Sequence, residues 1–392
     1  MNNSERDENN LRTNKIFQSI KSKDIRKYTM VVALLVIWGV FSFLTKGLFT
    51  SQRNLSNLFL QTSTIGILAC GIVFIMVTGN IDISLGSAVG ALGALAAALM
   101  INHDVSPVIA IIITLFSGVL LGLWHGYWIA YRRVPAMIAT LASMTALKGV
   151  TLGITKGITI SGFSDNFKAI GQGYVSKNIS LFITILAIVV FIFLDIRKRK
   201  SRIKYGFKVS NVPIMVLKNV LMAIVIGLVG NIMVGYRGIP YAIIILMGVA
   251  VVWTFIANKT PFGRSIYAIG GNVEAARFSG ININRNMLIM YAMMGFLSAV
   301  AALVLTARLN AATTSAGTSF EMDAIAAAVI GGTSPAGGVG TVFGAVVGAL
   351  VMASIDNGMS LLNVDILYQY IIKGLVLLLA VAIDAASRKK SL

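Results

Sequence analysis

The sequence predicts an all-α, polytopic membrane protein with about 10 to 12 transmembrane helices. The chain of 392 residues is 57% hydrophobic and only 12% charged, whereas a soluble domain carries about 25% charged residues. Apolar runs of about 20 residues recur along it, and this is the length that crosses a bilayer as a helix. Basic residues gather at the ends of alternate apolar runs, as the positive-inside rule predicts for cytoplasmic loops.

The net charge of +19 does not indicate a nucleic-acid-binding protein, because a phosphate groove needs its charge gathered on one soluble face. The basic clusters instead flank apolar runs, at 21–27, 132–133, 197–208 and 388–390. The single cysteine, Cys70, excludes an intrachain disulfide. Because the first apolar run lacks a small-residue cleavage pattern, we expect a retained first span.

The expected spans follow one another along the chain. They cover 29–48, 63–78, 85–101, 108–131, 135–152, 179–194, 216–234, 242–257, 287–306, a glycine-rich pair within 324–354, and 366–383. Between them we expect an outer interfacial stretch at 50–59, outer polar segments at 155–178 and 308–319, and a polar turn at 356–365. An even number of spans places both termini in the cytoplasm. If one or two interrupted segments are half-helices, 10 spans remain instead of 12.

This order predicts three regions. A polar cytoplasmic tail (1–28) precedes a membrane domain (29–385), and a basic cytoplasmic tail (386–392) follows it. Span parity also places a polar island, residues 258–286, in the cytoplasm.

Within the polar island, the pattern predicts a helix of about two turns. Asn272 is a suitable N-cap, Glu274 complements the helix dipole in the first turn, and Gly280 is a suitable stop. The pair Gly270 and Gly271 would form a hinge in front of it. This short helix is either a docking element for a partner protein or a plain connecting loop.

Two apolar stretches are interrupted by polar, glycine-containing segments, at 79–85 and 331–339. Each is followed by a Gly-x-x-x-Gly pattern, at 86–90 and 340–344, which is a weak internal similarity. Non-helical backbone at membrane depth must line a cavity or be buried in protein, so we favour a role in a transport pathway for the interruptions. For the glycine patterns we favour close helix packing.

Motifs for chemistry are missing. The dipeptide Gly-Lys of a Walker A motif does not occur, nor does H-E-x-x-H, a cysteine pair or G-x-S-x-G. We therefore expect no catalytic residue, no metal site and no cofactor, with His103 and His125 as isolated interfacial or packing residues. The ionisable residues in apolar surroundings are Asp82, Lys148, Glu321, Asp323, Asp356 and Lys373. They are candidates for ion coupling, but we favour a structural role, such as pairing with Arg308 or Lys373.

The run at 263–282 resembles the cytoplasmic coupling segment of the ribose/galactose/xylose-type permeases, which are membrane subunits of ATP-binding-cassette (ABC) sugar importers. The runs at 79–86, 321–340 and 356–362 resemble the same family. An extra hairpin at 179–234, with its basic cytoplasmic loop, is similar to the added length of the xylose and multiple-monosaccharide permeases.

The resemblance implies a multi-pass permease of the bacterial cytoplasmic (inner) membrane, surrounded by lipid, that imports a monosaccharide such as xylose by alternating access. It implies a second permease copy, a separate ATPase subunit and an extracytoplasmic binding protein, which the outer segments 155–178 and 308–319 are placed to meet. An ion-coupled secondary sugar carrier and a membrane-bound enzyme or scaffold are the alternatives.

The resemblance also assigns roles to individual residues. The residues that would dock the ATPase are Gly270, Gly271, Asn272, Glu274, Ala275, Ala276, Arg277 and Gly280. The residues that would shape the pathway are Gly79, Asp82, Gly86, Gly331, Gly332, Thr333 and Ser334.

Overall fold

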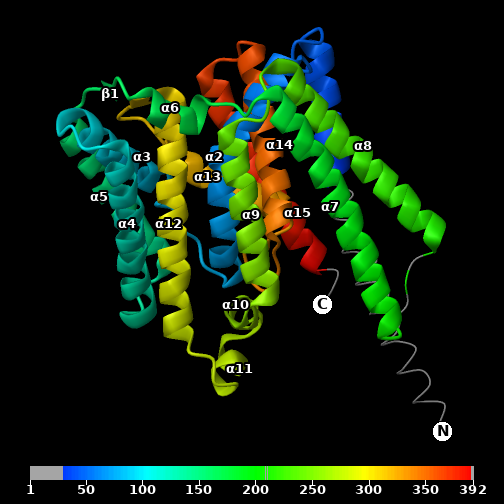
Figure 1. Cartoon of the computed structure of the whole chain (residues 1–392). Helices are drawn as coiled ribbons and strands as arrows, with labels where there is room; N and C mark the ends of the chain where they lie inside the picture. Colours follow the sequence, from blue (N-terminus) through cyan, green and yellow to red (C-terminus); the bar gives the residue numbers. More distant parts are fainter. Residues whose placement is uncertain (1–29, 208, 210, 390–392) are drawn as a thin grey trace.

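Ten helices in the described part of the chain are long and apolar enough to cross a membrane. The computed structural model describes residues 30–207, 209 and 211–389 (Figure 1). The long helices are α2 (Gln52–Val77), α3 with its π-helical end η1 (Leu85–Ala97, Ala98–Asn102), α4 with η2 (Pro107–Gly126, Tyr127–Tyr131), α5 (Ala136–Thr155), α7 (Lys177–Lys204), α8 (Val212–Tyr236), α9 (Tyr241–Lys259), α12 (Ile283–Leu309), α14 (Val342–Leu361) and α15 (Ile366–Lys389).

Shorter helices complete the bundle. They are Met30–Leu44, α6 (Asp165–Gln172), α10 (Pro261–Gly271), α11 (Val273–Phe278) and α13 (Phe320–Ile330). Ten long helices agree with the lower end of the predicted range. Met30–Leu44 and α13 are the two further apolar segments that the sequence counts toward 12. α13 has 11 residues, and the described part of the first helix has 15, whereas a helix of about 20 residues crosses a bilayer.

Helices α2 and α12 form the centre of the bundle. α2 contacts α8, α9, α12, α13 and α14, and most of its side chains are buried. α12 lies close against α4, and Gly118 of α4 and Gly295 of α12 each face the backbone of the other helix. A Cβ added to Gly118 would lie 2.5 Å from the Gly295 carbonyl oxygen, and a Cβ added to Gly295 would overlap the Gly118 carbonyl oxygen. Small residues at such a crossing allow the van der Waals contact that holds helices together in lipid.

Two predicted boundaries were wrong, and two helices continue beyond the predicted spans. Residues 50–59 are not an interfacial stretch, because α2 already begins at Gln52 and buries Leu55 and Leu58. The predicted turn at 356–365 is mostly helix, since α14 continues to Leu361. The basic segment after 196 continues α7 to Lys204, and α15 continues into the predicted basic tail as far as Lys389. In each case the helix continues through polar residues that flank an apolar run. The predicted tail at 1–28 lies outside the described residues.

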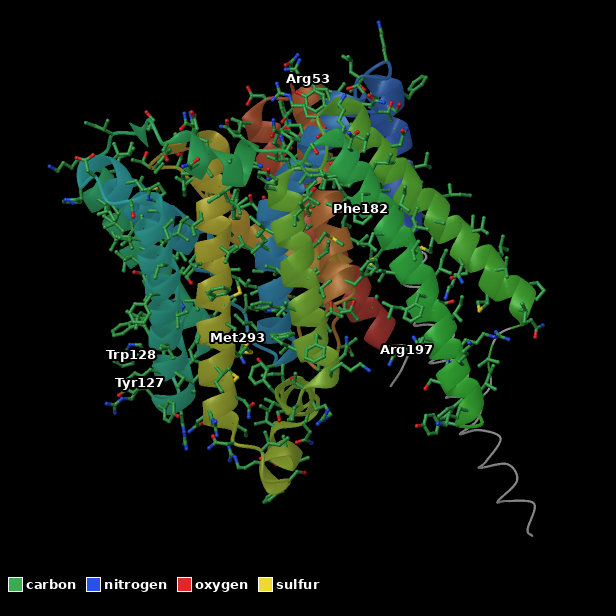
Figure 2. The ribbon with its side chains drawn as sticks, viewed as in Figure 1. Arg53, Tyr127, Trp128, Phe182, Arg197 and Met293 are labelled. Atoms are coloured by element: carbon green, nitrogen blue, oxygen red, sulfur yellow. The ribbon has the colours of Figure 1, made fainter. Side chains whose placement is uncertain are left out.

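One end of the bundle is marked by basic and aromatic residues. Arg197 on α7 and Tyr127 and Trp128 in η2 lie toward this end, whereas Arg53 of α2 lies at the other (Figure 2). Arg132, just after η2, donates a 3.0 Å hydrogen bond from its Nε to the Tyr127 hydroxyl. Helices α10 and α11 project at the same end, below α9 and α12 (Figure 1). Trp and Tyr are enriched at both surfaces of a membrane, whereas an excess of Lys and Arg in short loops is typical of the cytoplasmic side.

At the opposite end, the two predicted outer segments meet. Strand β1 (Ile160–Ser161) pairs antiparallel with β2 (Ala311–Ala312), so that Ile160 faces Ala312. Helix α6 lies on the end of α12, where the Gln172 side chain donates a 3.0 Å hydrogen bond to the Arg308 carbonyl oxygen. The segments 155–178 and 308–319 therefore form one surface.

The extra hairpin of the sequence is formed by α7 and α8. These helices contact each other, and their lower ends diverge from the bundle (Figure 1). Few of their residues are buried, and their exposed side chains are predominantly apolar. The hairpin is therefore an addition to the edge of the bundle and not part of its core.

Candidate functional site: the polar island and the two helix breaks

The helix predicted within the island is confirmed as α11. The Asn272 Oδ1 accepts a 2.9 Å hydrogen bond from the Ala275 N–H, and Glu274 lies in the first turn. Gly280 follows with a φ of +79°, a left-handed conformation that glycine adopts at little cost. The island therefore has the local structure that its capping residues predict.

The segment of the island that precedes α11 differs from the prediction. Residues 261–271 form a second helix, α10, which the Thr260 Oγ caps by accepting a 3.1 Å hydrogen bond from the Gly263 N–H. Gly270 and Gly271 are the last residues of this helix and not a free hinge. The pattern Thr-Pro at 260–261, an N-cap followed by proline at N1, is a sequence signal for this helix.

The island exposes most of the residues predicted to dock the ATPase. Gly271, Asn272, Glu274, Ala275, Arg277 and Gly280 are exposed, Gly270 is half-buried and Ala276 is buried. Two apolar side chains were not among the predicted residues. Phe278 is 89% exposed at the end of α11, and Val273 is exposed at its start. A phenylalanine within a polar segment is the sequence signal that could have identified Phe278 as a contact residue.

The first helix break, residues 78–84, separates α2 from α3. Asp82 is buried, and its Oδ1 accepts hydrogen bonds from the Ser84 N–H (2.8 Å) and the Ser84 hydroxyl (2.6 Å). The neighbouring Ile83 N–H donates to the Thr140 Oγ of α5 at 3.2 Å. The carboxylate of Asp82 therefore supports the turn that leads into α3.

The second break, residues 331–341, separates α13 from α14. Gly332, Gly337 and Gly338 have φ values of +85°, +93° and +76°, so the segment depends on glycine. The Ser334 hydroxyl donates a 2.9 Å hydrogen bond to Asp384 of α15. The Thr333 hydroxyl oxygen is buried and has no hydrogen-bond partner among the described residues.

The structure brings both breaks together at α10. The Gly338 N–H donates a 2.8 Å hydrogen bond to the Val77 carbonyl oxygen, which joins the second break to the end of α2. Gly270 lies against the same two groups: a Cβ there would overlap the Val77 oxygen and lie 2.8 Å from the Gly338 nitrogen. The Tyr267 hydroxyl also donates to the Gly340 carbonyl oxygen at 2.8 Å. Burial raises the pKa of Tyr267, so this hydroxyl keeps the proton that it donates.

The two Gly-x-x-x-Gly patterns pack against opposite ends of α13. A Cβ on Gly86 would overlap the Gly317 carbonyl oxygen and the Glu321 carboxylate, and one on Gly90 would lie 2.7 Å from the Ala316 oxygen. At the other end of α13, a Cβ on Gly344 would overlap the Gly331 oxygen. These close contacts support the packing interpretation of the glycines, although Gly86 and Gly90 pack mainly on the irregular segment before α13. The residues predicted to shape the pathway thus form two groups. Gly86 of α3 lies against the start of α13, and the others lie at the breaks: Gly79, Asp82, Gly331, Gly332, Thr333 and Ser334.

Intramembrane charges form an ion-pair network around α13. The Lys373 Nζ of α15 lies 3.0 Å from an oxygen of Asp323 in α13 and 2.8 Å from an oxygen of Asp356 in α14. Its exposure is only 17%. The pairing of Asp323 and Asp356 with Lys373 supports the structural interpretation of these residues, because it ties α13, α14 and α15 together.

We predict that Lys373→Met destabilises the protein by about 3–5 kcal/mol, because it leaves two carboxylates without their counter-charge. The measurement is the thermal unfolding midpoint in detergent. Lys168→Met is the matched control, since Lys168 pairs at 2.7 Å with Asp165, whose side chain is 96% exposed, and an exposed pair contributes little. Equal midpoints for the two variants would contradict the network's role.

No metal site is found in the described ranges, where no group of three or more His, Cys, Asp or Glu side chains is arranged to hold an ion. His125 lies buried beside Tyr291, with 6.4 Å between the ring centroids, and His103 is exposed. The two histidines therefore occupy separate surroundings.

Comparison with known proteins covers nearly the whole chain. Residues 54–381 match the family described as the permease component of branched-chain amino acid transport systems. The chain is 44% identical to the xylose transport system permease protein of Haemophilus influenzae, over 95% of this chain and 99% of the relative. It is 44% identical to the corresponding protein of Escherichia coli, over 96% and 95% of the two chains. No solved structure matches the chain.

The ribose import permease protein of Haemophilus influenzae is a more distant relative. It is 36% identical over 90% of this chain and 91% of the relative. The family match over 54–381 includes nine of the ten membrane-length helices whole or in large part, and all ten at least in part. The chain belongs to the family of transport-system permease components that includes the xylose and ribose permeases.

Proposed function

We propose that this chain is the membrane-spanning permease of an ABC importer for a monosaccharide, xylose or a related pentose or hexose. The observation that carries the proposal is the 44% identity to xylose permeases over 95% of the chain. The family description mentions branched-chain amino acids, but the two relatives at 44% identity are both named for xylose. As a permease, the chain would translocate its substrate, and a separate ATPase subunit would hydrolyse the ATP.

The island, α10 and α11, is the proposed docking site for the ATPase. The exposed Phe278 side chain at the end of α11 offers an apolar anchor, and the polar residues Asn272, Glu274 and Arg277 are exposed in the same segment. An amphipathic helix that inserts into a groove of a partner is a recurring mode of recognition.

The contact of α10 with both helix breaks supports alternating access driven from this site. A displacement of α10 would act directly on the Val77 and Gly338 backbone groups against which Gly270 lies. Because packed interfaces favour discrete arrangements, such a displacement would move α13 and α14 as bodies. The breaks and their residues, including Asp82, Thr333 and Ser334, would then change shape with each ATPase cycle.

The proposed orientation places α10 and α11, the basic ends of the helices and both termini in the cytoplasm. The surface formed by segments 155–178 and 308–319 would then face outward. Because this surface lies at the opposite end of the bundle from α10 and α11, it is the proposed contact for an extracytoplasmic binding protein. We also propose that a second copy of the chain completes the pathway.

Reconstitution tests the proposal. The chain would be inserted into liposomes with a candidate ABC ATPase and a candidate sugar-binding protein from its own organism, and ATP-dependent entry of labelled xylose, ribose and leucine would be measured. We expect sugar entry that requires ATP and all three components. Sugar entry without the ATPase, driven by a proton or sodium gradient, would establish the ion-coupled carrier instead. Entry of leucine alone would overturn the assignment to sugars.

A further inference from the structure

The α7–α8 hairpin encloses a small cavity near its lower end, between the two helices. Its volume is about 130 Å³, and its lining includes four cationic side chains, one carboxylate and an apolar methionine: Lys198, Arg199, Arg202, Lys218, Asp195 and Met215. Arg197, next to Lys198 in the chain, marks this level of α7 in Figure 2. Pockets for drug-sized molecules have roughly 300–1,000 Å³. The cavity therefore has room for one small charged group.

The charges that line the cavity come from one face of α7. Asp195, Lys198, Arg199 and Arg202 follow the i, i+3, i+4, i+7 spacing, which places side chains on the same side of a helix. The Asp195 carboxylate forms an ion pair with the Lys218 ammonium group of α8, which joins the two helices at the cavity. This pair is neutral as a whole. The other three cations therefore give the lining a net positive charge.

The length of α7 places the cavity at a membrane surface. The helix has 28 residues and is therefore about 42 Å long, which exceeds a hydrocarbon core of roughly 30 Å. Asp195 lies about 27 Å from the first residue of α7, at 1.5 Å per residue. Lys198 and Arg202 follow it, toward the end of the helix. The cavity is therefore at the depth where the hydrocarbon core meets the lipid headgroups.

Exposed apolar side chains lie directly beside the cavity. Leu194, the neighbour of Asp195, is 54% exposed, and Leu217, the neighbour of Lys218, is 61% exposed. Only 11% of the most apolar part of α7 and 6% of that of α8 are buried. Extended apolar surfaces of this kind mark contacts with a membrane or with another protein. A ligand of the cavity that carries acyl chains would cover both leucines, whereas a free anion would not.

We infer that the cavity between α7 and α8 binds the phosphate group of an anionic phospholipid, whose acyl chains lie on the exposed apolar faces of the two helices. A guanidinium group such as that of Arg202 donates paired hydrogen bonds to phosphate oxygens, and the Lys198 ammonium group adds a compact charge. Basic pockets between transmembrane helices are suited to anionic lipid headgroups. The site lies in the hairpin, away from the island and the helix breaks. The inference is therefore independent of which substrate the chain transports.

Native mass spectrometry of the full chain in a non-ionic detergent tests the inference. The probes are phosphatidylglycerol, phosphatidylcholine with the same acyl chains, and inorganic phosphate. We expect the native chain to bind one phosphatidylglycerol at least about tenfold more tightly than phosphatidylcholine, because several cations act on one phosphate. In the double variant Lys198→Gln and Arg202→Gln, we expect the affinity for phosphatidylglycerol to fall at least about tenfold.

The matched control is the double variant Arg197→Gln and Lys200→Gln. It also removes one arginine and one lysine from the same stretch of α7, and all four side chains are exposed. Arg197 and Lys200 do not line the cavity, and they lie about 140° and 160° around the helix from Arg202. We expect this variant to bind phosphatidylglycerol with the native affinity.

Equal losses in the two double variants would show a diffuse attraction to the basic end of α7 and would overturn the inference. Native affinity in the Lys198 and Arg202 variant, or no preference for phosphatidylglycerol in the native chain, would overturn it as well. Inorganic phosphate in large excess is expected to leave the lipid bound, and displacement of the lipid would identify a site for soluble phosphate instead. The unfolding midpoint without added lipid shows whether each variant is folded. If the first double variant is not, Arg202→Gln alone takes its place, with Lys200→Gln as its control.

Discussion

Phe278→Asp is expected to release the ATPase from the permease while leaving the permease folded. The side chain is 89% exposed, so the bundle does not depend on it. Burial of a phenylalanine at a partner surface contributes about 1.5–3 kcal/mol, and a carboxylate in its place adds a desolvation cost. We therefore expect the affinity for the ATPase to fall at least about 30-fold. The measurements are co-purification of the ATPase and its dissociation constant in detergent or nanodiscs.

The matched control for this variant is Phe207→Asp. Phe207 is 62% exposed and follows α7 at the same end of the molecule, but it belongs to the α7–α8 hairpin and not to the island. We expect this variant to keep the ATPase bound and both variants to keep the native unfolding midpoint. Unchanged ATPase affinity in Phe278→Asp would show that α11 is a connecting loop and that the partner binds elsewhere.

Gly270→Ala is expected to uncouple the island from the pathway. The added methyl group would overlap the Val77 carbonyl oxygen and lie 2.8 Å from the Gly338 nitrogen, and both are backbone atoms that cannot rotate away. α10 would have to move off both helix breaks, at a cost of about 1–3 kcal/mol for an overpacked site. We expect ATP-driven uptake to fall more than tenfold. The tip at Phe278 is unaltered, so we also expect the ATPase to remain bound.

The neighbouring glycine provides a control for folding. Nothing among the described residues lies within 4 Å of a Cβ placed on Gly271, so Gly271→Ala is expected to leave the unfolding midpoint unchanged. For uptake the control is Gly248→Ala in α9, where a Cβ also meets open space. If Gly270→Ala transports at the native rate, the contact between α10 and the breaks does not transmit the ATPase's motion.

Local sequence patterns predicted the helical elements well and their ends less well. The caps of α11 were predictable because Asn272 and Gly280 act on their own backbone neighbours. The start of α2 was not predictable, since its polar first turn is compatible with either an interfacial segment or a helix. Burial of Leu55 and Leu58 against other parts of the bundle decides in favour of the helix. Composition likewise indicated that Asp323, Asp356 and Lys373 have a structural role, but only the packing of three helices shows that one lysine serves both carboxylates.

The sequence by itself determined the class of the protein, the membrane-length spans, the capped helix of the island and the resemblance to sugar permeases. These depend on composition and on contacts between residues that are close in the chain. Only the tertiary structure decided that Gly270 touches Val77 and Gly338, and that Lys373 pairs with both Asp323 and Asp356. These residues are far apart in the sequence. No local sequence pattern specifies which backbone groups meet when helices pack, because in lipid the packing arrangement depends on the fit of whole helix surfaces.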